Sequence, residues 1–183
     1  MNETRTVPDV ELIRVGQWEI STGTWSPGRA DLASVVAAFN AGILRKPVIK
    51  LGHVDARFEA DHDGEPSFGY VDRLRLAEDG DLLLGDLVLP EWLAAALPMH
   101  YPDRSVEALQ GYEGAGGTVW PLVLTGVALL GATAPGIHSL KSLQDLVAAS
   151  RITLRPKVSR PGDHQRTVLI AASRRRRAHR KES

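Results

Sequence analysis

The stretch FGYVDRLRLAEDGDLLLGDLVL, residues 68–89, decides the fold class of this chain. Two runs rich in Val and Leu flank Glu78-Asp79-Gly80, and the glycine of this turn tolerates the positive φ angle that a tight connection requires. The pattern predicts a β-hairpin.

Further strands are expected on both sides of the hairpin. Residues 10–20 alternate between apolar and polar side chains and contain β-branched and aromatic residues, which favours a strand. Residues 48–53 form an apolar run that predicts a buried strand. Residues 104–109 predict another strand, residues 112–117 a flexible turn, and residues 119–130 one long or two short strands.

Three helices are expected between and after these strands. In residues 26–43, Leu32, Val35, Val36 and Phe39 follow the i, i+3, i+4, i+7 spacing of an amphipathic helix. Shorter helices are predicted at residues 90–97, which begin with proline, and at residues 139–150. Strands outnumber helices and the connections are short, so the pattern indicates a β-rich α+β domain, either a barrel or a sandwich, flanked by helices.

Charge divides the chain into two parts. Residues 1–150 contain 11 Lys and Arg against 20 Asp and Glu, whereas residues 151–183 contain 11 against 2. The 183 residues and the 43% apolar content suit one ordinary domain, which we expect to span residues 1–150. The basic tail, residues 151–183, has the composition of a segment that is disordered when free.

Several classes of protein are disfavoured by composition. The chain has no cysteine, which removes disulfides and thiolate metal ligands and fits a reducing cytoplasm. The N-terminal residues contain no apolar segment of the kind that directs secretion. The longest apolar stretch, residues 121–137, is interrupted by Thr, Gly and Pro, so we expect buried strands there and no membrane helix.

Two residues at strand ends are candidates for nucleophilic chemistry. Ser105 begins a predicted strand, and His53 ends a different one in the stretch KPVIKLGHVDARF, residues 46–58. A serine hydroxyl needs a base to accept its proton as it attacks a carbonyl, and histidine suits that role. From spacing alone, a purely structural role for both residues is the simpler interpretation.

Four segments, in order along residues 16–146, resemble the head maturation proteases of tailed phages, and most closely the Mu-type prophage protease branch. They are residues 23–56, GTWSPGRADLASVVAAFNAGILRKPVIKLGHVDA; residues 68–87, FGYVDRLRLAEDGDLLLGDL; residues 101–109, YPDRSVEAL; and residues 125–143, TGVALLGATAPGIHSLKSL. The resemblance implies a herpesvirus-assemblin-like serine protease, a β-barrel of mostly antiparallel strands with surrounding helices. Such proteases need no cofactor.

The resemblance also implies partners and a location. Proteases of this family trim scaffold and major capsid proteins inside the assembling prohead, in the host cytoplasm. Relatives with this fold suggest a homodimer that forms through a helix. No membrane partner is expected.

The same resemblance assigns roles to individual residues. The family histidine, in a Gly-His motif after an apolar strand, falls on His53, and the nucleophile of an Arg-Ser strand motif falls on Ser105. The acid that follows this motif is Glu107. Where Mu-type relatives usually carry a further histidine that looks like the third catalytic member, this chain has Gly126.

The identity of the third member is therefore open. Glu107 lies two residues along the same predicted strand as Ser105, and so on the same face. Asp103, His100, His62 or a water molecule are the other candidates. A protein of the same fold that has lost activity and serves as an assembly scaffold or capsid-associated protein is the alternative function.

Two loops have a functional and a simpler interpretation. The glycine-bearing loop at residues 131–137 offers the backbone N–H groups of Gly131 and Ala132 for an oxyanion hole, or is a plain turn. The segment after His53, rich in acidic residues and with one further histidine, is favoured as a solvated loop, and no metal site is expected, although carboxylates and imidazole are able to bind a divalent ion. These residues are Asp55, Asp61, His62, Asp63 and Glu65.

The tail region contains a repeated motif. LVAASR, residues 146–151, and LIAASR, residues 169–174, each place an aliphatic residue before Ala-Ala-Ser. Because assemblin-like proteases as a family cut Ala-Ser bonds, Ala149-Ser150 and Ala172-Ser173 are possible self-cleavage sites, with chance repetition in an alanine-rich chain as the alternative. The final run RRRRAHRK, residues 174–181, supports non-specific attraction to nucleic acid or to an acidic scaffold or capsid surface.

Overall fold

A six-stranded mixed sheet organises the chain in a computed structural model that describes residues 3–53 and 64–149. The strands lie in the order β1-β6-β5-β4-β8-β7, and only β4 and β8 run parallel. Their bounds are β1 Thr4–Arg14, β4 Val48–Leu51, β5 Tyr70–Ala77, β6 Leu82–Pro90, β7 Asp103–Glu113 and β8 Val119–Leu130. The predicted α+β class is confirmed, whereas the predicted domain boundary at residue 150 and the basic tail lie outside the described residues.

The hairpin predicted at residues 68–89 is confirmed as β5 and β6. Its turn, Glu78–Gly80, has φ angles of 51° at Glu78, 53° at Asp79 and 93° at Gly80, so the left-handed region that was expected at the glycine extends over three residues. Arg14 of β1 donates to the Glu78 carboxylate at 2.5 Å, which contributes to holding this turn against the neighbouring strand.

The single strand predicted at residues 10–20 is wrong, because two separate strands cover this region. β1 ends at Arg14, and a short hairpin follows that consists of β2 Trp18–Ile20 and β3 Gly23–Trp25. Gly16, with φ of 155°, turns the chain between them, and a Cβ at this position would lie 2.8 Å from the Trp18 ring. The Trp18 indole donates to the Arg14 carbonyl at 2.9 Å, so the aromatic residue that suggested a strand instead stabilises the turn.

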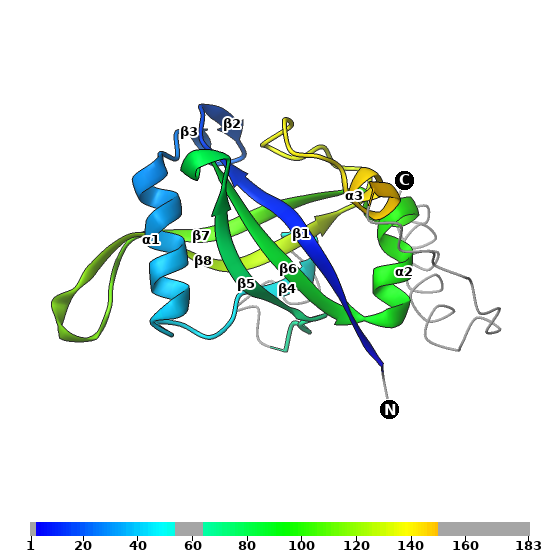
Figure 1. Cartoon of the computed structure of the whole chain (residues 1–183), viewed down its shortest axis with the longest axis horizontal. Coiled ribbons are helices and arrows are strands. Elements are labelled where there is room, and N and C mark those ends of the chain that lie inside the picture. Colours follow the sequence, from blue (N-terminus) through cyan, green and yellow to red (C-terminus); the bar gives the residue numbers. More distant parts are fainter. Residues whose placement is uncertain (1–2, 54–63, 150–183) are drawn as a thin grey trace, which may run out of the picture. The chain divides into compact units, whose positions relative to one another are not determined.

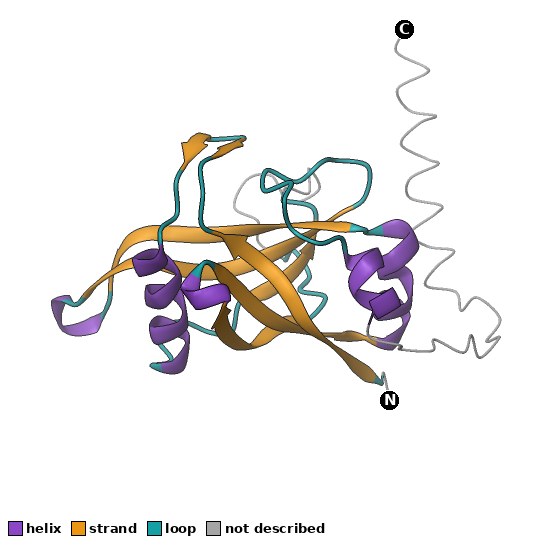
Figure 2. Cartoon of the chain, turned by 45° about the horizontal axis from the view of Figure 1, so that its top comes forward, coloured by secondary structure: helices purple, strands orange, loops and turns teal. Residues whose placement is uncertain are grey.

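The three predicted helices are present. α1 Arg29–Asn40 begins after Gly28, whose N–H donates to the Asp31 carboxylate at 2.8 Å, and its apolar face packs on β8 and β5. α2 Glu91–His100 follows Pro90, as expected. α3 Leu143–Ala149 begins four residues later than predicted. α1 lies at one end of the sheet, and α2 and α3 lie together at the other (Figures 1 and 2).

The sheet is open, so the closed barrel implied by the resemblance is not formed. Among the described residues, no ladder joins the edge strands β1 and β7. A side chain connects them instead: Arg104 of β7 is 2% exposed and its Nε donates to the Glu11 carbonyl of β1 at 2.6 Å. Glu11 immediately precedes a bulge in β1, which interrupts the regular register there. Burial lowers the pKa of Arg104 to about 10.

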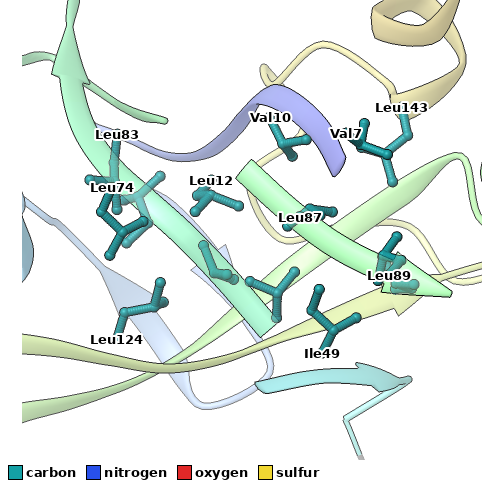
Figure 3. Packing of buried hydrophobic residues seen from close by; sticks show 14 of the residues in the cluster. Val7, Val10, Leu12, Ile49, Leu74, Leu83, Leu87, Leu89, Leu124 and Leu143 are labelled. Carbon is teal, nitrogen blue, oxygen red and sulfur yellow. The ribbon is translucent and has the colours of Figure 1, made fainter. Parts of the chain in front are cut away.

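The hydrophobic core lies between the two halves of this curved sheet. Figure 3 shows Leu12, Leu74, Leu83 and Leu87 from β1, β5 and β6 pointing toward side chains from β4 and β8, among them Ile49. Leu143 of α3 covers one end of the core near Val7 of β1 (Figure 3). The concave face of the curved sheet is therefore filled by apolar side chains, whereas polar side chains lie on the opposite face.

A buried carboxylate stabilises two bulges in the part of the sheet formed by β1, β6 and β5. Asp86 of β6 has no exposed side-chain surface, and it accepts hydrogen bonds from the Asp9 N–H at 3.2 Å, Arg73 Nε at 2.6 Å and Arg75 Nη1 at 3.0 Å. Asp9 and Arg73 both have positive φ, at bulges of β1 and β5 respectively. Burial by itself raises the pKa of Asp86, but these hydrogen bonds outweigh it and the net pKa is lowered.

Replacing Asp86 with Asn is expected to lower the free energy of unfolding by about 1.5–3 kcal/mol, because it removes the charge from a buried group that accepts hydrogen bonds from two guanidinium groups, of which Arg75 keeps its ion pair with Asp9. Since the folded-state pKa of Asp86 is lowered, its contribution is present at neutral pH and is lost as the pH falls below about 4. Urea unfolding at pH 7 and pH 3 measures both effects.

Asp72→Asn, on the neighbouring strand β5, is the matched control. The Asp72 carboxylate is partly exposed and pairs with Lys46 at 3.0 Å, so its loss is expected to cost less than about 1 kcal/mol. Equal losses in the two variants would show that Asp86 has no special role.

Candidate active site

Strand register brings residues that are far apart in the sequence onto one face of the sheet. β8 pairs with β4 on one side and with β7 on the other, so that Lys50, Ala128 and Ser105 lie in one row across the three strands. Val48, Gly126 and Glu107 form the adjacent row on the same face. The intervening row contains Ile49 and Val127, which are fully buried in the core. Alternation therefore directs Lys50, Ser105 and Glu107 away from the core.

His53 reaches this face through a turn at the end of β4. The strand ends at Leu51, two residues earlier than predicted, and Gly52 has φ of 79° while its N–H donates to the Leu129 carbonyl at 3.0 Å. The left-handed glycine bends the chain so that the His53 ring lies 3.1 Å, Nδ1 to Oε1, from the Glu107 carboxylate. The Gly-His motif is thus a strand end followed by a turn, with His53 40% exposed.

Glu107 is the group that contacts the His53 ring. Lys50 Nζ lies 3.1 Å from Oε1 and 3.4 Å from Oε2 of the same carboxylate. Burial by itself raises the pKa of Glu107. The hydrogen bonds from His53 and Lys50 lower this pKa by more, so the net pKa is below the ordinary value. Glu107 is therefore an anion at neutral pH.

Gly126 leaves the space that the Glu107 carboxylate occupies. A Cβ built on Gly126 would lie 3.2 Å from Glu107 Oε2 and 3.3 Å from the Val48 carbonyl oxygen, closer than nearly all Cβ contacts. The resemblance led us to expect a histidine at this position. Any side chain at this position would require the Glu107 carboxylate or the Val48 backbone to shift by a few tenths of an ångström.

Two other candidates for the third member, Asp103 and His100, form no hydrogen bond with the ring. Asp103 begins β7 and His100 ends α2, and within the described part of the chain the His53 ring forms a side-chain hydrogen bond only with Glu107. His62 lies outside the described residues.

Ser105 and His53 line the same cleft, but no hydrogen bond joins their side chains. The cleft has a volume of about 960 Å³ and is bordered by β7, the β2–β3 hairpin and the loop at residues 133–137, with His53, Ser105 and Glu107 in its wall. Within residues 3–53 and 64–149, the Ser105 hydroxyl has no hydrogen-bond partner, so the bond between nucleophile and base that a catalytic pair needs is not formed here.

The loop predicted to supply oxyanion donors borders the cleft through different residues. Thr133, Ala134, Pro135 and Gly136 line the cleft, whereas Gly131 and Ala132, the two residues predicted for this role, are exposed and do not line it. A role for this loop in binding an oxyanion stays a prediction.

Lys50 is a site residue that the sequence reasoning did not single out. The signal that could have found it is a lone charged residue within the apolar run VIKL, which is unusual for the buried strand that was predicted there. Trp25 and Ile20, which also border the cleft, gave no signal, because an aromatic or aliphatic residue in a short strand is common.

Several predictions concern features that lie at or beyond the limits of the structure. Ala149 ends α3, whereas Ser150, Ala172 and Ser173 lie outside the described residues, as do Asp55, Asp61, His62 and Asp63 of the acidic loop. In the part of the chain that is described, no three His, Asp or Glu side chains are arranged to hold a metal ion. None of the helices described is both long and apolar enough to span a membrane.

No protein-family model matches the chain, and no curated protein or solved structure matches it significantly. Arguments about function therefore rest on the geometry of the site and on the sequence motifs.

Replacing Gly126 with Ala is expected to displace the Glu107 carboxylate by a few tenths of an ångström and to weaken its hydrogen bonds to His53 and Lys50. Those bonds lower the pKa of Glu107, so its titration is expected to move to higher pH in the variant. The ¹³C chemical shift of the Glu107 carboxyl carbon, followed through an acid titration, measures this change.

Gly28→Ala serves as the control, because a Cβ there would meet only Asp31, at 3.7 Å, and Gly28 lies outside the cleft. This variant is expected to leave the Glu107 titration unchanged. The same titration in wild type and Gly126→Ala would mean that the glycine does not determine the position of Glu107.

Proposed function

We propose that this protein is a serine endopeptidase with Ser105 as nucleophile, His53 as general base and then acid, and Glu107 as the group that orients His53. The observation that carries the proposal is the 3.1 Å contact between His53 Nδ1 and Glu107 Oε1 in the wall of the cleft that also contains Ser105. A histidine oriented by a carboxylate, beside a serine, is the arrangement that activates a hydroxyl.

The chemistry follows from which ring nitrogen is free. An ionised Glu107 accepts the hydrogen bond of Nδ1–H, which leaves the lone pair on His53 Nε2. Nε2 takes the Ser105 proton as Oγ bonds to the substrate carbonyl carbon, and then returns it to the departing amine as the peptide C–N bond breaks. Water, activated by the same nitrogen, hydrolyses the resulting ester and restores the hydroxyl. Substrate binding has to bring Oγ and Nε2 into contact, as is common for catalytic hydrogen bonds that are long in free enzymes.

The edge of β7 supports a peptide substrate. Residues 104–110 all border the cleft, so the side chains on both faces of β7 do so. The cleft therefore extends along the edge of this strand. The Leu129 carbonyl accepts a hydrogen bond from β4, so the N–H and C=O groups of the next residue, Ala128, point to the other side, toward β7. Ser105 is the partner of Ala128, so its own N–H and C=O groups point into the β7–β8 ladder. The N–H and C=O groups of Arg104 and Val106 then point to the open edge on either side of the nucleophile. An extended peptide adds there as a further strand.

The sequence motifs supply the biological setting of the proposal. On the basis of the resemblance to Mu-type head maturation proteases, the proposal takes the open sheet as a form of the assemblin-like fold. It takes scaffold and major capsid proteins as the substrates, inside the prohead in the host cytoplasm. The second candidate is an inactive scaffold or capsid-associated protein of the same fold. The unbonded Ser105 hydroxyl is the observation that favours it.

A fluorophosphonate probe separates the two candidates, because it labels only an activated serine. We expect labelling of wild type at Ser105, none in Ser105→Ala or His53→Ala, and labelling slower by about 10² to 10⁴-fold in Glu107→Gln, which loses the charge that fixes the ring. Mass spectrometry of the labelled peptide identifies the modified residue.

Matched controls are available on the loop beyond β8. Ser139 and His138 are exposed, and neither lines the cleft, so Ser139→Ala and His138→Ala are expected to be labelled as fast as wild type. Absence of labelling in wild type, both free and in assembled particles, would contradict the enzyme and favour the scaffold.

Self-processing is the second test of activity. If the protease cuts Ala149-Ser150 and Ala172-Ser173, wild type under assembly conditions is expected to lose its C-terminal residues while Ser105→Ala keeps all 183. Intact mass spectrometry measures the chain lengths. Equal, full-length masses for both proteins would contradict self-cleavage without bearing on cleavage of other substrates.

A further inference from the structure

The ammonium group of Lys50 contacts three acceptors that belong to the candidate site. Its Nζ lies 2.9 Å from the His53 carbonyl oxygen, 3.1 Å from Glu107 Oε1 and 3.4 Å from Glu65 Oε2. The Lys50 side chain is 13% exposed, and the two carboxylates are 29% and 12% exposed for Glu107 and Glu65. An ammonium has three N–H donors, and those of Lys50 form hydrogen bonds to the His53 carbonyl and the Glu107 carboxylate, while Glu65 adds an ion pair.

These contacts restrain both members of the His53–Glu107 pair at once. The bond to the His53 carbonyl restrains the backbone after Gly52, and the bonds to Oε1 and Oε2 restrain the Glu107 carboxylate. The ion pair with Glu65 adds a restraint from the chain segment that follows residue 64. The position of the ring relative to its carboxylate therefore depends on one cation.

We propose that Lys50 is the positioning residue of the site: it holds the Glu107 carboxylate against His53 Nδ1, and so keeps the ring in the Nδ1–H tautomer with Nε2 free toward the cleft. This inference rests on the proposed function for its catalytic meaning, whereas the positioning itself is a property of the folded chain. Lys50 Nζ is the donor in its hydrogen bonds to His53 and Glu107, so the role assigned to it is positioning and not that of the base.

Electrostatics explains why the charge matters beyond the contacts. Glu107 is half-buried beside an apolar sheet, and a carboxylate there needs charged or polar partners to remain ionised. Without the ammonium, the carboxylate gains by turning toward water, which breaks its contact with Nδ1. Arginine retains the charge, but its planar fork donates in different directions from the three donors of an ammonium, so it replaces Lys50 only in part.

The ¹⁵N chemical shifts of the His53 imidazole, measured on the full chain above the pH at which the ring is protonated, report the tautomer directly. We expect the Nδ1–H tautomer to predominate in wild type, a mixture or the Nε2–H tautomer in Lys50→Met, and an intermediate result in Lys50→Arg. Lys50→Gln, which keeps a polar head, is made in parallel so that the test stands if Met at this position prevents folding.

Lys46→Met is the matched control. Lys46 lies four residues earlier, pairs with Asp72 at 3.0 Å and stands over the Tyr70 ring, outside the cleft. Its removal is expected to leave the His53 signals unchanged. A predominant Nδ1–H tautomer in folded Lys50→Met or Lys50→Gln would overturn the proposal.

The labelling rate at Ser105 provides the functional readout. If the protease is active, Lys50→Met is expected to be labelled about 100-fold more slowly than wild type, as misplacing a catalytic group by about 1 Å does, and Lys50→Arg is expected to recover part of the loss. The two readouts separate the hypotheses. Unlabelled wild type contradicts the proposed protease, whereas an unaltered tautomer in the Lys50 variants contradicts the positioning role.

Discussion

The parallel ladder between β4 and β8 is the constraint on which the candidate site depends. Four consecutive pairs, from Val48 with Gly126 to Leu51 with Leu129, bind the segment that precedes His53 to the strand that also pairs with β7. A shift of one residue in this register would turn Lys50 into the core and Ile49 out of it, because side chains alternate along a strand. Burial of Ile49 and Val127 thus enforces the same register that places Lys50 beside the row of Glu107.

Charge and volume are matched within the site. A half-buried carboxylate costs free energy unless it is hydrogen-bonded, and Glu107 meets that requirement with a lysine of β4 and a histidine in the turn that follows β4. Gly126 makes the arrangement possible, since any side chain there competes with Glu107 for space. The glycine that at first suggested a missing catalytic member is therefore better understood as the reason that a glutamate is able to occupy the position.

Leaving the sheet open has a consequence for function. Arg104 connects the two edge strands through its side chain, so the backbone edge of β7 beside Ser105 is not consumed by a ladder to β1. Exposed strand edges invite pairing with other chains, and proteins usually block them. Here the edge lies within a cleft bordered by the β2–β3 hairpin and the loop at residues 133–137.

The sequence by itself determined the α+β class, the β5–β6 hairpin and the three helices, because turns, helix starts and apolar periodicity are local signals. The choice of Ser105, His53 and Glu107 as residues to follow rested instead on the resemblance of the sequence motifs. The sequence did not determine the break at Gly16, where the Trp18 indole bonds to the Arg14 carbonyl, or the open sheet, whose edge strands are connected by a buried bond between residues 93 positions apart. Nor did it reveal the role of Lys50, which contacts Glu107, 57 positions later in the chain, and Glu65. Only the tertiary structure decided these features, since neighbouring residues do not specify which distant strands pair or which charges that pairing brings together.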